Sequence, residues 1–281
     1  MMLKLDSRNY AAASLALESV HINTLFAGAV LKGETSGEVY VDNLQQPRTF
    51  YVAHAYGMSL VFGDSGNADF NRSLCDYITN KAGERHSTEW LQADPAGDWT
   101  PLIDSIRSMH NSTLKQSANL PEAEDLRRIE RNTRVNFTFN REAYVLAKEQ
   151  WFRHDAEIVR MTAELFSNQD GGVIARFFWR DQEHFLTSGA GFTLLHEGKN
   201  ASTAFSAYRT ENQLEIGIES AAAHRGRHYA FSVCAALIDY CLEHGLEPVW
   251  GCRQENEPSY RLAQKLGFRV SLTLPYYRLA Q

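Results

Sequence analysis

Residues 214–268 constrain the possible folds of this chain more than any other stretch. They begin with alternating apolar residues (LEIGIE), pass through a short basic turn (RGRHYA, 225–230), and continue into an apolar stripe of helical period that ends at Gly245. Alternation is typical of a strand, a 3.6-residue period is typical of a helix, and glycine is a common helix end. A short strand at 248–250 and a capped helix at 256–267 follow. The stretch therefore predicts a mixed α/β domain.

The basic turn at the start of the predicted helix consists of Arg225, Gly226, Arg227, His228, Tyr229 and Ala230. The first turn of an α-helix leaves backbone N–H groups without intrahelical partners, and the helix dipole places partial positive charge there. Because the two arginines add further positive charge, a phosphate group is the natural ligand of this turn.

Net charge and composition exclude several classes of protein. The net charge of −6 and the pI near 5.9 argue against nucleic acid as the main partner, because phosphate-backbone binding needs a basic face. An apolar run long enough for a signal peptide or a membrane span is absent, so we expect a cytoplasmic protein with no membrane partner. The four cysteines show no metal-ligand spacing, and we expect no metal site.

A polar stretch at 110–133 is the best candidate for a domain boundary. Short apolar runs bounded by turn residues precede it, and they predict antiparallel strands at 37–41, 49–53 and 58–62. After it we expect a helix at 155–166, followed by strands at 173–179, 184–195, 201–208 and 213–219. The sequence thus predicts an N-terminal α/β domain over residues 1–130 and a second domain over 131–281.

The second domain resembles the GCN5-related N-acetyltransferases (GNAT). The turn at 225–230 is similar to their Arg/Gln-x-x-Gly-x-Gly/Ala motif, with His228 in the place of the first motif glycine. Asn256-x-x-Ser259-x-x-Leu262 and the following Lys-Leu-Gly-Phe resemble their later Asn…Gly-Phe segment. Within the superfamily, the chain is similar to the group related to the zwittermicin A resistance acetyltransferase.

The resemblance implies a GNAT-like fold, in which a mixed, mostly antiparallel sheet is flanked by helices. The resemblance is compatible with an N-terminal domain that is a degenerate copy of the same fold and shapes the acceptor site. It is also compatible with a homodimer. The implied activity is transfer of an acetyl group from acetyl-CoA to a primary amine of a small molecule or peptide, by direct attack in a ternary complex.

The resemblance also implies the residues that contact acetyl-CoA. Ile218, Glu219 and Ser220 would lie near the thioester, the turn from Arg225 through Gly226, Arg227, His228 and Tyr229 to Ala230 would hold the pyrophosphate, and Asn256 and Ser259 would face the cofactor. Glu215 or Glu219 could take the proton of the amine, directly or through water.

Each assignment has a simpler alternative. The two glutamates can be solvated strand carboxylates, and Asn256 can be only a helix cap. The helix position where many family members carry a tyrosine acid corresponds to Ala263, which leaves the acid unassigned. Two other functions therefore stay open: a non-catalytic acyl-CoA-binding module, and an aminoacyl-tRNA-dependent ligase built from two GNAT-like domains. The acidic net charge and the CoA-type turn count against the ligase.

Overall fold

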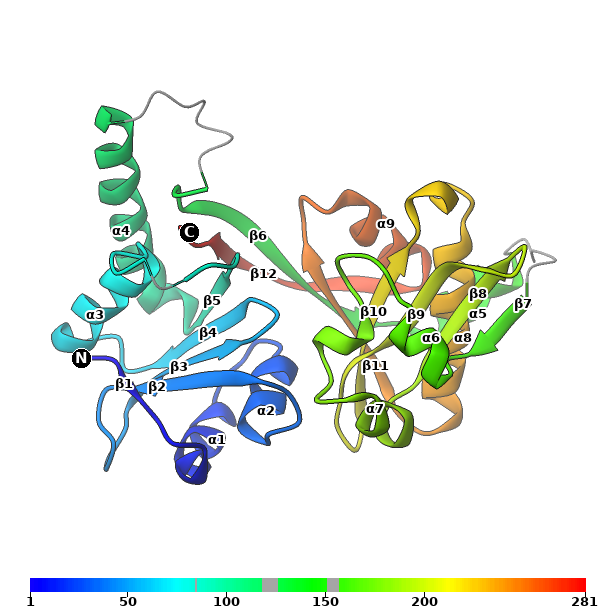
Figure 1. The fold of residues 1–281 in the computed structure, drawn as a ribbon, viewed down its shortest axis with the longest axis horizontal. Helices are drawn as coiled ribbons and strands as arrows, with labels where there is room; N and C mark the ends of the chain where they lie inside the picture. Colours follow the sequence, from blue (N-terminus) through cyan, green and yellow to red (C-terminus); the bar gives the residue numbers. More distant parts are fainter. Residues whose placement is uncertain (84, 118–125, 151–156) are drawn as a thin grey trace. The chain divides into compact units, whose positions relative to one another are not determined.

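The computed structural model describes every residue except 84, 118–125 and 151–156, and it consists of two compact units (Figure 1). Unit 1 comprises Met1–Arg134 and Thr273–Gln281, and unit 2 comprises Val135–Leu272. The predicted α/β class, with a mostly antiparallel sheet flanked by helices, is confirmed. In the described part of the chain, no helix has the length and apolarity needed to cross a membrane.

Unit 1 contains a meander that ends in a parallel pair of strands. Its strands are β1 (Leu3–Lys4), β2 (Gly37–Val41), β3 (Thr49–His54), β4 (Met58–Gly63) and β5 (Trp90–Asp94), and its helices are α1 (Ala11–Leu17), α2 (Leu25–Leu31), α3 (Ala68–Ile78) and α4 (Ala96–Ser117), with a 3₁₀ turn η1 at Ser7–Asn9. Neighbouring strands from β1 to β4 pair antiparallel, whereas β4 and β5 pair parallel. The three strands expected from the apolar runs are confirmed as β2, β3 and β4.

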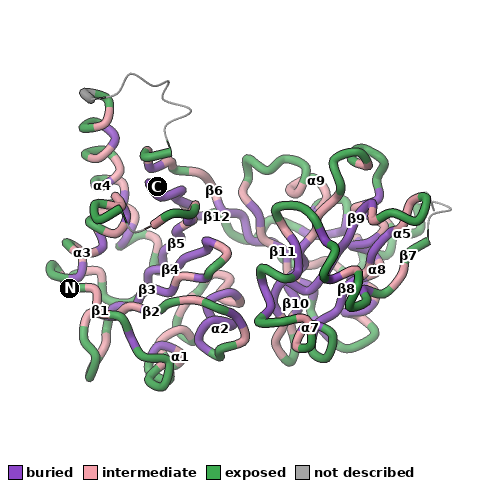
Figure 2. The backbone as a smooth tube through the Cα atoms, viewed as in Figure 1, coloured by how far each residue is buried: buried purple, intermediate pink, exposed green. Residues whose placement is uncertain are grey.

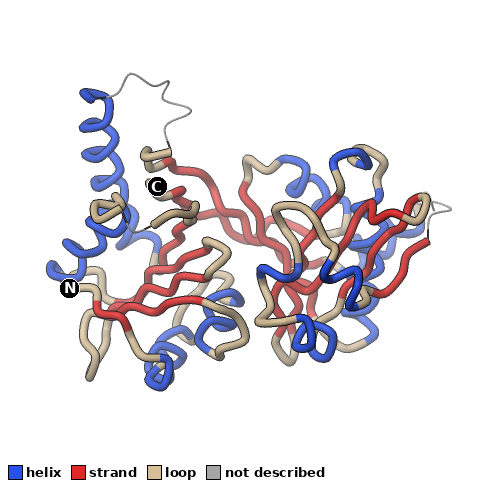
Figure 3. Tube along the Cα trace, in the orientation of Figure 1, coloured by secondary structure: helices blue, strands red, loops and turns tan. Residues whose placement is uncertain are grey.

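Unit 2 repeats this order of antiparallel strands followed by one parallel pair. Figure 3 marks its strands in red and its helices in blue. Its strands are β6 (Glu130–Phe139), β7 (Glu157–Arg160), β8 (Gly191–His196), β9 (Lys199–Arg209), β10 (Gln213–Ser220), β11 (Glu247–Arg253) and β12 (Phe268–Arg278). Its helices are α5 (Arg141–Glu149), α6 (Ala163–Ser167), α7 (Gln182–Ser188), α8 (Tyr229–Glu243) and α9 (Glu257–Lys265), with 3₁₀ turns η3 (Ala175–Phe177) and η4 (Ala222–His224).

The division of the chain differs from the predicted boundary at 130/131. β6 begins in unit 1 and continues into unit 2, while β12 begins in unit 2 and ends in unit 1. The end of β12 joins unit 1 because Tyr277 pairs with Leu91 of β5, and because Tyr277, Leu279 and Ala280 are buried in the core of that unit. Local sequence patterns carry no information about such a long-range pairing.

Helix α8 is the centre of the core of unit 2 (Figure 2). The predicted apolar stripe is confirmed, because Tyr229, Val233, Leu237, Tyr240 and Cys241 are all buried. Leu214 and Ile216 of β10 belong to the same cluster, and Ile218 packs against it. Glu215 and Glu219 alternate with these residues and therefore lie on the other face of the strand.

Several expected elements in the chain are wrong. Within the described residues, strand β7 and the short helix α6 replace the helix expected at 155–166. Strand β7 forms because it pairs with β8, and Arg160 of β7 stacks over Phe192 and Tyr240. Residues 173–179 contain the 3₁₀ turn η3 (Ala175–Phe177) instead of a strand. The first part of 184–195 is helix α7, because Asp181 accepts a hydrogen bond from the His184 amide and caps it.

Helix α4 begins at Ala96, and the fully buried Trp99 anchors its first turn. Within the polar stretch at 110–133, residues 118–125 lie outside the described part of the chain.

Candidate active site

The parallel strands β10 and β11 separate part-way along their length. In the described pairing, Gln213, Leu214 and Glu215 of β10 lie opposite Glu247, Pro248 and Val249 of β11, and the register goes no further. On its other edge, β10 remains paired with β9 as far as Ser220. Residues 216–220 therefore have one edge in the sheet and one edge available to a ligand.

Local packing accounts for the shape of β10 at this point. Its register with β9 shifts between Glu215 and Ile216, where the separation from β11 also begins. Gly217 follows, and a Cβ atom at this position would lie 2.6 Å from the ring of Phe205. That ring is fully buried and packs against Phe178 at 5.7 Å. A glycine is therefore needed opposite Phe205 of β9, because the Phe205 ring occupies the space of a side chain at position 217.

The turn between β10 and α8 depends on two residues with left-handed backbone conformation. Gly226 has φ +76° and His228 has φ +65°. Glycine adopts this conformation without strain, and histidine is among the side chains that tolerate it better than most. His228 is also the N-cap of α8, so the residue in the place of the motif glycine occupies a position where glycine is favoured. The predicted turn and helix start are thus present with a strained residue.

Arg227 and Tyr229 are tied to one histidine of β8. The ring of His196 is 3.3 Å from a guanidinium nitrogen of Arg227 and 3.1 Å from the hydroxyl of Tyr229. The ring of His224 lies 5.2 Å from that of His196. Residues 225–228 themselves are exposed, so the turn that precedes α8 is open to solvent.

Glu219 holds a separate loop against the end of β10. Its Oε2 accepts hydrogen bonds from the amides of Gly172 (3.0 Å) and Val173 (3.1 Å). Its Oε1 accepts from the Ser220 amide at 3.2 Å and lies 3.5 Å from the Arg225 guanidinium. Arg225 also donates to the Ser220 carbonyl at 3.3 Å. The predicted thioester residues and the basic turn are therefore connected through this one carboxylate.

A small pocket of about 130 Å³ lies beside Glu219. It is lined by Asn168, Gln169, Asp170, Asn200, Thr203, Glu219 and Ala221. Outside this lining, the Ser202 hydroxyl donates to the Glu219 carbonyl at 3.4 Å and lies 2.8 Å from the Ser220 hydroxyl. Sequence reasoning identified Glu219 and Ser220 but missed the loop at 168–173. Its Asn-Gln-Asp-Gly-Gly sequence indicates a turn and gives no sign of the strand that it contacts.

Glu215 has a different environment from Glu219. It is 5% exposed and lies within the paired part of β10, between Tyr208 of β9 and Val249 of β11. Glu219, in contrast, is beyond the point where the strands separate, and its side chain is 17% exposed. Of the two carboxylates, Glu219 is the more accessible to a reacting group.

Asn256 and Ser259 stabilise the start of α9. The Asn256 side chain accepts from the Ser259 amide at 3.4 Å, and the Ser259 hydroxyl accepts from the Trp250 indole of β11 at 3.2 Å. Ala263 is fully buried in the core, and the Tyr260 ring packs against Phe137 at 5.5 Å. These contacts fix α9 to β11. Ala263 has no acidic group, and Tyr260 is partly buried against the core.

The separation of strands distinguishes unit 2 from unit 1. In the parallel pair of unit 1, residues 58–62 of β4 and 90–94 of β5 stay in register throughout. The following loop carries Asp64 and the first turn of α3 carries Asp69, where unit 2 has arginines, and Asn67 caps α3 by accepting from the amides of Asp69 and Phe70. In the described residues, the combination of an open strand edge and a basic turn therefore occurs only in unit 2. A group of side chains able to hold a metal is absent from the same residues.

Comparison with known families identifies this arrangement. The profile of the GNAT acetyltransferase family matches residues 17–277. The chain belongs to the GNAT acetyltransferase family. An uncharacterized N-acetyltransferase of Bacillus subtilis, YdfB, is 23% identical over 272 residues, which are 96% of this chain and 95% of that protein. The family and this relative support an acyltransferase activity.

Solved structures support the GNAT fold over the full length of the chain. A GCN5-related N-acetyltransferase-like protein from Streptococcus suis superposes with a TM-score of 0.70 and 21% identity, covering 98% of this chain and 100% of that one. A tandem GNAT protein from the clavulanic acid biosynthesis pathway gives a TM-score of 0.58 and 12% identity, covering 99% and 97%. At these identities the likeness concerns the fold alone.

Proposed function

We propose that this GNAT chain transfers an acetyl group from acetyl-CoA to a primary amine. The observation that carries the proposal is the separation of β10 from β11 after Glu215, followed along the chain by the exposed basic turn before α8. An open strand edge can pair with an extended, amide-containing ligand. A helix N-terminus beside arginines favours a phosphate. Acetyl-CoA combines these two features in one molecule.

The residues present fit this ligand. The backbone of Ile218, Glu219 and Ser220 lies on the open edge, and we assign it to the thioester end. We assign the amides and arginines of the turn from Arg225 to Ala230 to the pyrophosphate, since the left-handed Gly226 and His228 shape that turn. Asn256 and Ser259 are assigned to the opposite side of the opening, where they keep α9 attached to β11.

Bound acetyl-CoA would supply an acyl carbon that an unprotonated amine can attack, with loss of the thiolate. Backbone N–H groups at the end of β10 would donate to the developing oxyanion. The amine must first lose a proton, and we assign its removal to Glu219 through a water molecule, because the carboxylate is already hydrogen-bonded to backbone amides. Glu215 is the second candidate, although its burial limits access.

We also propose that unit 1 is a degenerate copy of the same fold. It has the same succession of antiparallel strands and one parallel pair, with α3 between the parallel strands as α8 is in unit 2. The acceptor is proposed to be a small molecule or a peptide, and the resemblance to the zwittermicin A resistance group favours an aminated small molecule.

Isothermal titration calorimetry with acetyl-CoA, CoA and deacylated tRNA tests the proposal. We expect acetyl-CoA to bind with a micromolar Kd and tRNA not to bind. Arg225→Ala should weaken acetyl-CoA about tenfold, because a positive charge near the phosphate site is lost. Arg180→Ala removes an exposed arginine that pairs with Asp181 and serves as the control. Absence of acetyl-CoA binding would refute the proposal. Binding without acetyl transfer to any member of an amine library would favour a non-catalytic acyl-CoA-binding module.

A further inference from the structure

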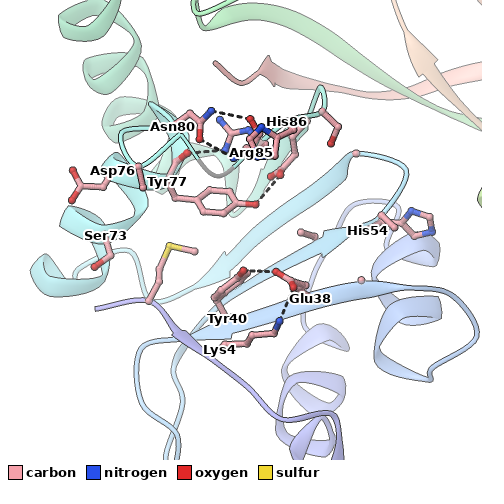
Figure 4. A pocket seen from close by; sticks show the side chains of 18 of the residues that line it. Lys4, Glu38, Tyr40, His54, Ser73, Asp76, Tyr77, Asn80, Arg85 and His86 are labelled. Atoms are coloured by element: carbon pink, nitrogen blue, oxygen red, sulfur yellow. Dashed lines mark hydrogen bonds and ion pairs between the residues drawn. The ribbon is translucent and has the colours of Figure 1, made fainter. Parts of the chain in front are cut away.

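Unit 1 contains a large pocket that the proposed acetyl transfer does not use. Its volume is about 1080 Å³, at the upper end of the range for small-molecule sites. All of its lining residues belong to unit 1: they come from β1, β2, β3, the C-terminal half of α3, the following loop and Glu89. Figure 4 shows Glu38 and Tyr40 of β2 on one side and Tyr77 and Asn80 on the other.

The wall formed by the loop after α3 is fixed by several hydrogen bonds. The side chain of Asn80 accepts from the Arg85 amide (3.0 Å) and donates to the Arg85 carbonyl (2.9 Å). The Arg85 guanidinium donates to the carbonyls of Tyr77 (2.7 Å), Ile78 (3.0 Å) and Ala280. Its charge thus lies at the C-terminal end of α3, where the helix dipole favours a cation. The pocket wall is therefore a built structure.

The charges at the edge of the pocket are compensated by each other. Lys4 pairs with Glu38 at 2.6 Å, and Lys81 pairs with Asp76 at 2.9 Å. Glu38 and Asp76 are thus paired with lysines, and Arg85 is bound to three carbonyls. The lining carboxylate without an ion pair to a described residue is Glu89. It is 6% exposed, and its partners among the described residues are the hydroxyls of Tyr51 and Tyr77, the second at 2.8 Å.

Glu89 forms no ion pair with any described residue, although it lines the pocket. Two neutral hydroxyls compensate a buried carboxylate only in part, and a cation is the group that would complete its environment. Burial raises the pKa of Tyr77, and the charge of Glu89 raises it further, so this hydroxyl stays protonated and continues to donate.

The two hydroxyls bound to this carboxylate belong to aromatic rings, those of Tyr51 and Tyr77. One face of the Tyr77 ring carries the Arg85 guanidinium, 5.0 Å from the ring centre, which is the geometry of a cation–π contact. The rings of Tyr51 and Tyr77 are 5.0 Å apart, and the ring of Tyr40 lies 6.0 Å from that of Tyr77. The faces of tyrosine rings attract organic cations, and a neighbouring carboxylate strengthens the attraction. An inorganic cation would need several oxygen ligands, whereas Glu89 offers one carboxylate beside an aromatic wall.

We propose that this pocket of unit 1 binds a small organic ammonium ion, with Glu89 as its counter-charge and Tyr40 and Tyr77 as its aromatic wall. The site is independent of the acetyl-CoA site, because its lining residues all belong to unit 1, whereas those assigned to acetyl-CoA all belong to unit 2. The proposal therefore stands or falls separately from acetyl transfer.

Ligand-observed NMR with benzylammonium and tetramethylammonium, each titrated to about 10 mM, tests the site, with benzyl alcohol as the uncharged control. We expect at least one cation to bind the full-length protein, and the alcohol to bind about tenfold more weakly or not at all. Glu89→Gln should weaken the cation about tenfold or more, since it removes the charge and keeps the shape. Glu18→Gln, which neutralises an exposed carboxylate after α1, should leave binding unchanged.

A second variant, which blocks the pocket sterically, tests the proposal if Glu89→Gln does not fold. Ser73 of α3 lines the pocket, is half-buried and lies one helical turn before Tyr77, so Ser73→Trp occupies the part of the cavity beside the Tyr77 ring without changing the charge of the pocket. We expect this variant to lose cation binding and to retain the calorimetric affinity for acetyl-CoA. Failure of both cations to bind the wild-type protein, equal binding of the alcohol, or undiminished cation binding by Ser73→Trp would each overturn the proposal.

Discussion

The carboxylate of Glu219 and the amide of Gly172 form a hydrogen bond of 3.0 Å across 47 residues of sequence. Gly171 makes this contact possible, because a Cβ atom there would lie 2.5 Å from the Glu219 side chain. The bond places the loop at 168–173 beside the end of β10 and next to the start of the basic turn. A residue chosen as a candidate base is thus also a structural link between two parts of the site.

Glu219→Gln separates these two roles. The amide keeps one acceptor oxygen, so the variant must lose hydrogen bonds either to the 172–173 amides or to Ser220 and Arg225. If Glu219 removes the proton of the amine, kcat/KM for a confirmed acceptor should fall about 100-fold or more in this variant. The decrease of kcat/KM at low pH that protonation of the base causes in the wild type should then disappear. If Glu219 only positions the loop, the rate falls and the pH profile keeps its shape.

Glu164→Gln, at an exposed position of α6, is the control for Glu219→Gln. An unchanged turnover in Glu219→Gln would contradict both roles. The base would then have to be Glu215 or a group outside the predicted set.

The parts of the site that could be predicted from sequence are those encoded locally. The alternation in β10, the basic turn and the stripe of α8 lie within one stretch, and each element carries its own pattern of periods and caps. The sequence also showed His228 in the place of the motif glycine, whereas its left-handed conformation became apparent only in the structure. Predicted elements in this stretch are therefore confirmed with nearly correct limits.

The parts that could not be predicted depend on contacts between distant residues. Strand β7 is short, and its sequence fits a helix about as well as a strand; its pairing with β8 decides. The end of β12 joins unit 1 through pairing of Tyr277 with Leu91, and Glu89 meets Tyr51 only after the chain has folded. Local patterns contain the period of an element and say nothing of its partner.

Gly217→Ala should destabilise unit 2 by about 1–3 kcal/mol, because the added methyl group would meet the buried ring of Phe205 at 2.6 Å. The distortion falls where β10 leaves β11, so acetyl-CoA binding should weaken as well. Urea unfolding and calorimetry measure the two effects. Gly28→Ala in α2, where a Cβ atom has nothing within 4 Å, is the control and should be neutral or stabilising. Wild-type stability in Gly217→Ala would show that Phe205 can move away.

His228→Gly should raise the free energy of unfolding of unit 2 by up to about 1 kcal/mol. The gain comes from relief of the left-handed strain at φ +65°, reduced by the greater flexibility of glycine in the unfolded chain. His244→Gly is the matched control: His244 follows the same helix, has φ −104°, and should lose stability on replacement. Thermal unfolding of both variants checks the difference. A fall of more than about 1 kcal/mol in His228→Gly would show that contacts of the imidazole outweigh its strain.

The stability of unit 1 should depend on pH through His54. Burial lowers the pKa of this histidine to about 4; its Nδ1 accepts from the Tyr56 amide at 2.9 Å, and its Nε2 lies 3.0 Å from the Thr35 hydroxyl. An unfolded histidine has a pKa near 6.5, so the unfolded chain binds the additional proton between about pH 6.5 and pH 4. The contribution of neutral His54 to the free energy of unfolding is therefore complete above pH 6.5 and is lost as the pH falls, by about 3 kcal/mol at pH 4.

Urea unfolding at pH 7.5 and pH 5 should show a smaller pH dependence in His54→Gln than in the wild type, whereas the exposed His86→Gln should match the wild type. Equal pH dependence in all three proteins would contradict a neutral, buried His54.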